Sequence, residues 1–184
     1  MELENMFRGI GTDIMSCDGR KVFGSGIVFE SDYFYIVKND PYFRNEFGDT
    51  SPLGIKWFKV HKSSIAMNTG LKDSTTWEQL TKAEQINSGE TKETWEGKPI
   101  YGSIKLDGEM TRGGDIVRID NKYNINYTGV IEYCESTAMF WHHRHYVDNA
   151  GINKSYHEDI RNYLNEYYTI SVIGNAFQNP ELLE

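Results

Sequence analysis

The chain has 184 residues, enough for one domain or two small packed ones with a sizeable core. Aromatic residues make up 14% and Gly outnumbers Pro by 17 to 4, which favours sheets joined by tight turns over a disordered linker. The net charge of −8 argues against generic nucleic-acid binding, which needs Lys and Arg to displace counterions from phosphate.

The two cysteines and the opening residues indicate a compartment. Cys17 and Cys134 lie far apart without a CxxC spacing, so we expect free thiols in a reducing environment. The first ten residues contain no apolar run, and no window approaches about 18 consecutive apolar residues. We therefore expect no signal peptide, no membrane span and a cytoplasmic location in a bacterial host cell.

The first strands are predicted from Lys21 onward. β-rich runs at 26–30 and 33–38 flank Ser31-Asp32, which has the form of a short hairpin connection. Residues 39–52 have the composition of a loop, and 55–61 return to a strand pattern.

A helix is predicted over about 76–87. Trp77, Leu80 and Ala83 fall at helical spacing, Thr75 with Glu78 has the form of a capping box, and Gly89 is a natural stop. The polar residues that follow, to Gly97, are typical of an exposed loop.

Strands dominate again from Lys98. Asp107-Gly108 is a turn signal, and Gly114 to Tyr133 reads as a strand–turn–strand unit of a small barrel. A second helix is predicted over 156–167, with Ser155 and Glu158 as its capping box, before a final strand that contains Gly174. The fold class is therefore mainly β, with SH3-like barrel hairpins and two short helices.

Several motifs, taken in order, resemble the YopX-like phage and prophage proteins. The tail from Val172 to Leu183, VIGNAFQNPELL, matches the closing signature of that family, and 69–73 match its TGLKD element. Ile100-Tyr101 with 114–117 supply the two halves of its IYEGDIV segment, and GVIEY at 129–133 supplies the next strand. Met6-Phe7-Arg8 and Val22-Phe23-Gly24-Ser25 are similar to its opening elements.

The chain also departs from that pattern. The connection from TGLKD to GDIV is much longer than usual, and Gly9 stands near the place of an expected Trp. The resemblance implies a phage or prophage origin and a mainly β fold, for a family without a settled activity. It implies one domain over 1–184, or two packed sub-parts at 1–72 and 98–184 joined by a helical insert at 73–97.

The densest group of candidate ligands is the run from Trp141 to His145. On a strand, His143 and His145 share one face while His142 points to the other, so at most two imidazoles of the run converge on a metal. Cys134, Asp148 or His157 would have to approach to complete a site. We favour a polar, partly exposed strand and predict no metal site.

Other chemical motifs are weak. The chain has no GxSxG elbow, and GIGTD and GSG lack the Lys-Ser/Thr of a phosphate loop. We expect Cys17 to be a small hydrophobe beside a turn, Cys134 to be packed, and Asp115 to cap its own turn. Asp115 and Asp120 bracket one strand, but paired carboxylates need a geometry that a sequence cannot establish. We therefore predict no catalytic residues, no cofactor and no enzyme.

Aromatic side chains are numerous enough to supply a binding surface. Surplus Trp and Tyr favour interfaces, although core packing can absorb rings too. The rings in question are Trp57, Phe58, Trp95, Tyr123, Tyr127, Phe140, Trp141 and Tyr146. We expect a binding or assembly module that meets a protein partner or a second copy of itself. The alternatives are a nucleic-acid-associated barrel, which the charge does not favour, and a weak metal-dependent enzyme.

Overall fold

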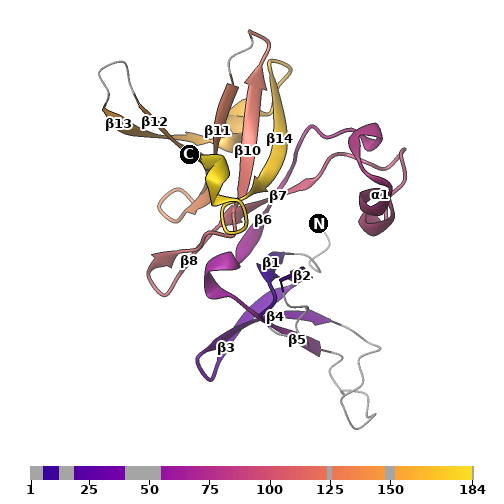
Figure 1. The fold of residues 1–184 in the computed structure, drawn as a ribbon, viewed down its shortest axis with the longest axis vertical. Helices are drawn as coiled ribbons and strands as arrows, with labels where there is room; N and C mark the ends of the chain where they lie inside the picture. Colours follow the sequence, from indigo (N-terminus) through magenta and orange to yellow (C-terminus); the bar gives the residue numbers. More distant parts are fainter. Residues whose placement is uncertain (1–5, 13–18, 40–54, 124–125, 148–151, 184) are drawn as a thin grey trace.

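The computed structural model describes residues 6–12, 19–39, 55–123, 126–147 and 152–183, and these residues form a mainly β protein (Figure 1). The strands in chain order are β1 (Phe7–Ile10), β2 (Lys21–Gly24), β3 (Gly26–Glu30), β4 (Tyr33–Asn39), β5 (Ile55–Val60), β6 (Ala66–Lys72), β7 (Pro99–Ser103), β8 (Lys105–Leu106), β9 (Glu109–Met110), β10 (Asp115–Asn121), β11 (Asn126–Cys134), β12 (Met139–Val147), β13 (Asn153–Asp159) and β14 (Tyr168–Asn175). The helical segments are η3 (Lys62–Ser64), η4 (Trp77–Gln79), α1 (Lys82–Ser88), η5 (Ile160–Tyr163) and η6 (Pro180–Leu183).

The C-terminal half is a curled antiparallel sheet in the order β13-β12-β11-β10-β14. Its inner face and the short η5 segment enclose a core of seven buried side chains. These are Ile100, Val117, Ile119, Ile131, Ile160, Tyr163 and Ile170. The predicted strand–turn–strand unit is confirmed as β10 and β11, with Ile116 opposite Val130.

The N-terminal half continues the same sheet through a parallel contact of β7 with β11, from which β6, β1 and β2 follow. A separate sheet, β3-β4-β5, packs on this part around a second core of Val22, Ile36, Val60, Ile65 and Ile104. Gly24 permits this packing, because a Cβ there would meet the Val37 carbonyl and the Ile36 side chain.

A buried ion pair joins the two halves. Arg8 on β1 and Asp115 on β10 are 7% and 1% exposed, and their charged atoms lie 2.7 Å apart. The second oxygen of Asp115 accepts the Tyr101 backbone N–H at 2.8 Å, and Arg8 donates to the Gly113 carbonyl. Asp115 therefore ties β1, β7 and β10 together, and the expectation that it caps its own turn is replaced by this role.

The turns are as the sequence predicts. Ser31 and Asp32 both have positive φ, of 49° and 67°, in the two-residue connection from β3 to β4. Asp107 and Gly108 do the same between β8 and β9, with φ of 51° and 80°. Positive φ at both central residues is what a hairpin turn matched to the twist of its strands requires.

The insert contains one short helix rather than a helix over all of 76–87. Residues 77–79 form η4, and α1 begins after Thr81, whose hydroxyl accepts the Glu84 backbone N–H while Glu84 accepts the Thr81 N–H. The capping box therefore starts at Thr81, not Thr75. Gly89 ends α1 in the left-handed conformation, as predicted.

The second predicted helix, at 156–167, is wrong. Residues 153–159 pair with β12 along their whole length, so Ser155 lies within a strand and caps nothing. Ile160 and Tyr163 are buried, but only on the single turn of η5, and Leu164 is exposed. Residues 160–163 therefore form one helical turn. Residues 153–159, which precede that turn, are held in a strand by pairing with β12.

Candidate functional site: a groove on the outer face of the sheet

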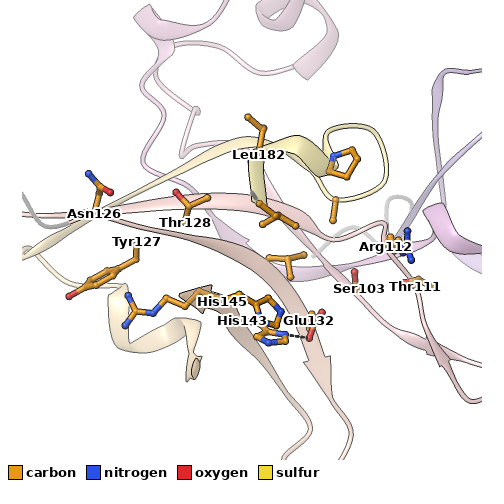
Figure 2. A pocket seen from close by; sticks show the side chains of 15 residues that line it. Ser103, Thr111, Arg112, Asn126, Tyr127, Thr128, Glu132, His143, His145 and Leu182 are labelled. Carbon is orange, nitrogen blue, oxygen red and sulfur yellow. Dashed lines mark hydrogen bonds and ion pairs between the residues drawn. The ribbon is translucent and has the colours of Figure 1, made fainter. Parts of the chain in front are cut away.

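An open groove of about 650 Å³ runs along the outer face of β11 (Figure 2). Residues from the end of β7, from β11 and β12, from the segments that follow β9 and β14, and from the C-terminal η6 line it. They are Ser103, Thr111, Arg112, Asn126, Tyr127, Thr128, Val130, Glu132, His143, Arg144, His145, Ala176, Pro180, Leu182 and Leu183. Small-molecule and cofactor sites commonly have volumes of this order, roughly 300–1,000 Å³.

Strand alternation determines which side chains form the floor. Thr128, Val130 and Glu132 on β11 share the face opposite to the buried Ile131. Lining residues extend from Asn126 to Glu132, which at ~3.4 Å per residue gives a floor about 20 Å long. The groove is therefore elongated, and Figure 2 shows Asn126 and Arg112 at opposite ends of it.

The wall facing β12 is the C-terminal segment, which a turn after β14 folds back over β11. The Asn175 side-chain oxygen accepts the backbone N–H groups of Phe177 and Gln178, and the Asn175 N–H donates to Asn179. Gly174 has no side chain beneath this turn, and a Cβ there would meet Leu182 and Asn179. These contacts explain the Gly-Asn and Asn-Pro steps of the tail and place Pro180, Leu182 and Leu183 on the groove.

Histidines form the other wall. The His143 Nδ1 lies 2.9 Å from a Glu132 carboxylate oxygen, and the His143 ring stacks on His157 at 3.9 Å between centroids. His145 lies 4.6 Å away on the same face, so the predicted pairing of His143 with His145 is confirmed and His157 joins them. Burial, followed by the nearby His143, lowers the pKa of His157.

His142 points to the other face, as predicted. It is fully buried against the Tyr163 ring, and neither ring nitrogen has a hydrogen-bond partner among the residues that the structure describes. Burial, and then the positive charge of Arg144, lower its pKa to about 4. At neutral pH this imidazole is therefore uncharged and packs like an aromatic side chain.

The described residues contain no group of three His, Cys, Asp or Glu side chains placed to hold a metal ion. For His143 and His157 the stacking is unfavourable to a shared metal ion, because their planes are tilted by only 24°. Lone pairs of near-parallel rings point side by side rather than toward one ion. The Cys134 thiol instead contacts the Ser136 hydroxyl at 3.1 Å. Hydrogen bonds from the side chains of Ser136 and Thr137 lower the pKa of this thiol to about 7.

The groove combines cationic and apolar surface. Glu132, its one carboxylate, is engaged by His143, whereas no partner is found for the Arg112 guanidinium within the described part of the chain. Arg144 lies over the Tyr127 ring at 4.0 Å and near Tyr156 at 4.7 Å. The two arginines of the lining therefore outnumber its one carboxylate, although the chain as a whole is acidic.

The remaining candidates from the sequence are dispersed. Asp120 pairs with Arg118 on the surface, far from the buried position of Asp115. Cys17, Asp148 and the Tyr146 side chain lie outside what the structure describes.

The aromatic side chains divide between core and surface. Phe58 packs on the N-terminal core, and Tyr127 and Phe140 pack on the C-terminal core. Trp57 and Tyr123 remain 43% and 72% exposed. Trp95 and Trp141 are partly buried and donate hydrogen bonds to the Thr75 carbonyl and the Thr137 hydroxyl.

Sequence reasoning missed the groove itself. Glu132, Arg112 and Leu182 come from segments that no local motif connects, and the return of the chain after Asn175 adds Leu182 to the other two. Two features of the sequence could have indicated a groove. Residues 128, 130 and 132 alternate with core positions and therefore face outward, and the tail ends in the apolar pair Leu182-Leu183.

Fold and groove together define a mainly β protein, built on a curled half-barrel sheet with an open binding groove on its outer face. A family model described as YopX protein matches residues 108–184. The matched segment contains the tail and the GDIV and GVIEY motifs, so the resemblance predicted from those motifs is confirmed over these residues. The similar motifs at 6–8, 22–25 and 69–73 lie outside the matched segment.

Neither the curated proteins nor the solved structures contain a match to this chain. No helix within the described ranges is long and apolar enough to cross a membrane.

Proposed function

We propose that this chain is a phage- or prophage-derived binding protein of the bacterial cytoplasm, which holds an extended acidic–apolar segment of a partner protein in the β11 groove and catalyses no reaction. The family motifs of the tail support the origin. The shape of the groove supports the binding role, because a floor about 20 Å long suits an extended chain of several residues better than a compact small molecule.

The single observation that carries the proposal is the arrangement of the lining. Leu182, Leu183 and Pro180 offer apolar surface along one wall, and the guanidinium of Arg112, which has no partner among the described residues, lies at one end. A partner segment that placed an apolar side chain against η6 and a carboxylate beside Arg112 would match both of these features. Every lining residue except Ser103 belongs to the segment that matches the family.

A display library of random peptides of about a dozen residues tests the proposal. We expect the wild-type protein to enrich peptides that combine an acidic residue with a large apolar one several positions away. Arg112→Glu should reverse the charge preference, and Leu182→Asp should abolish enrichment, because each alters one half of the groove. Arg118→Glu is the matched control, since Arg118 is an exposed arginine outside the groove.

Three outcomes would contradict the proposal. The first is no enrichment over the Leu182→Asp variant, and the second is a set of peptides that bind all variants equally. The third is a protein that is dimeric at micromolar concentration in light scattering and monomeric as Leu182→Asp, which would mean that a second copy of the chain fills the groove.

A further inference from the structure

Three imidazoles cluster at the groove wall that β12 forms, between the Asn126 end and the Arg112 end (Figure 2). His143 lies directly opposite Val130 of the floor, and His145 follows it on the same face with its ring 4.6 Å away. His157 on β13 is directly opposite His143 and stacks on it. The His143 side chain is only 16% exposed, whereas His145 is exposed. His145 is therefore the imidazole that a segment bound in the groove would contact.

The nearest charged group to this cluster is a carboxylate. Glu132 on β11 lies 2.9 Å from the His143 Nδ1 and is the one acidic residue of the lining. His145 has no hydrogen-bond or ion-pair partner among the residues that the structure describes. The other charged side chains on the elements around the cluster are Arg112 and Arg144 in the lining and, outside it, the Arg118–Asp120 and Arg161–Asp159 pairs and Glu181.

The charge of the lining depends on whether these imidazoles carry a proton. Two arginines against one carboxylate give a net charge of +1 with neutral imidazoles, and protons on His143 and His145 would bring it to +3. Histidine is the side chain that gains its charge in mildly acidic solution, since its ordinary pKa is about 6.5. Burial, followed by the nearby His143, lowers the pKa of His157, so that ring stays uncharged to a lower pH than a free imidazole.

We propose that His145, with His143 beside it, is a second anion position of the groove, which binds an acidic side chain of the partner segment in mildly acidic solution. The inference rests on the proposed function, because its ligand is the same extended acidic–apolar segment. Arg112 holds one carboxylate at any pH, since a guanidinium keeps its charge. A proton on His143 offsets the Glu132 charge, and a proton on His145 supplies the cation for a second carboxylate.

Binding and protonation are therefore coupled at this position. A carboxylate placed beside His145 favours the charged imidazole, so the protein takes up protons when the segment binds near neutral pH. The two anion positions lie apart along the groove, as Figure 2 shows for Arg112 and His145. The segment that fills both carries two acidic residues, several positions apart in the chain.

Peptide display at about pH 7.5 and again at about pH 5.5 tests the inference. We expect the peptides enriched at the lower pH to carry one acidic residue more than those enriched at the higher pH. A synthetic copy of the most enriched low-pH peptide should bind roughly tenfold more tightly at the lower pH in isothermal titration calorimetry. Binding at about pH 6.5 should take up protons, measured in buffers of different ionisation enthalpy. The same peptide with glutamine for the additional acidic residue should lose this gain.

Three variants connect the effect to one side chain. His145→Gln should keep the affinity of the wild type at the higher pH and lose both the gain and the proton uptake. His145→Lys, which is charged at both pH values, should bind tightly at both. His61→Gln is the matched control, because His61 is an exposed imidazole outside the lining and should behave as the wild type does.

The inference and the proposed function fail in different ways. Equal affinity at the two pH values without proton uptake, for peptides that Leu182→Asp does not bind, would overturn the inference alone. A gain that persists in His145→Gln would also overturn it. No enrichment at either pH would overturn both proposals. Melting temperature identifies a variant that fails to fold, and His145→Lys decides if His145→Gln is lost in this way.

Discussion

At the scale of single residues, the family motifs correspond to buried polar anchors rather than to reactive groups. Asp115 of the GDIV segment holds Arg8 and the Tyr101 backbone, and Asp73 of the TGLKD segment accepts four hydrogen bonds. Both carboxylates are at least 95% buried. Buried carboxylates need such partners, because an unpaired charge in the interior is very costly.

The first prediction concerns the Arg8–Asp115 pair. Asp115→Asn should lower the free energy of unfolding by about 3–5 kcal/mol, because it leaves the Arg8 charge buried without its counter-charge. Urea denaturation measures this. Asp120→Asn is the control, since Asp120 pairs with Arg118 at the surface and should change stability by no more than ~0.5 kcal/mol. Equal small effects in both variants would contradict the role given to Asp115.

The second prediction concerns His142, whose pKa is lowered from 6.5 to about 4 in the folded protein. Between these two values the unfolded chain binds a proton that the folded chain excludes, so stability falls as the pH falls through this window. His142→Leu removes the imidazole that binds this proton. From about pH 7 to about pH 5 the wild type should lose ~2 kcal/mol more than the variant in urea denaturation. Parallel losses in the two proteins would show that His142 is not the titrating group.

At the scale of elements, Asp73 fastens the insert to the edge of the barrel. One oxygen accepts the Thr75 and Lys98 backbone N–H groups, and the other accepts the Val172 N–H on β14 and the Thr75 hydroxyl. The outer edge of β14 is thereby covered at this point instead of being left open to pair with another chain.

The third prediction follows from this contact. Asp73→Ala should raise amide hydrogen exchange at Val172 and Lys98 by at least tenfold, because both N–H groups lose their acceptor. Exchange at Ile119, in the middle of β10, should change only as global stability changes. Glu78→Ala, which removes an exposed carboxylate of the same insert, should leave the Val172 amide as it is. Unchanged exchange at Val172 in the Asp73 variant would refute the fastening role.

Local chemistry predicted the turns well and the helices less well. Ser31-Asp32 and Asp107-Gly108 are read correctly because a two-residue connection depends only on its own residues and neighbouring strands. The helix predicted at 156–167 fails because β12 offers residues 153–159 a full set of hydrogen bonds, which a local periodicity cannot reveal. The groove could not be predicted for a similar reason, since η6 reaches β11 only through tertiary packing.

At the scale of the whole molecule, two cores share one sheet. The seven-residue C-terminal core and the N-terminal core are bridged by β6, β7 and the Arg8–Asp115 pair. We therefore propose that the chain unfolds as one cooperative domain, although its sequence also suggested two packed sub-parts.

The fourth prediction tests that cooperativity. Ile36→Ala and Ile131→Ala each empty space in one core and should cost about 2–5 kcal/mol. Each should shift one shared urea transition, seen at the same midpoint by tryptophan fluorescence and by circular dichroism. Two separate transitions, each moved by only one of the variants, would mean that the two parts fold independently.

The central claim is that the β11 groove is the binding site of this protein. Amide chemical-shift mapping by NMR, with the most enriched peptide from the display selection as the probe, tests it most directly. The account predicts shifts along Thr128–Glu132, at Arg112 and at Leu182–Leu183, with none on β3-β4-β5 and none in the Leu182→Asp variant. Shifts that cluster on another face, or that persist unchanged in Leu182→Asp, would contradict it.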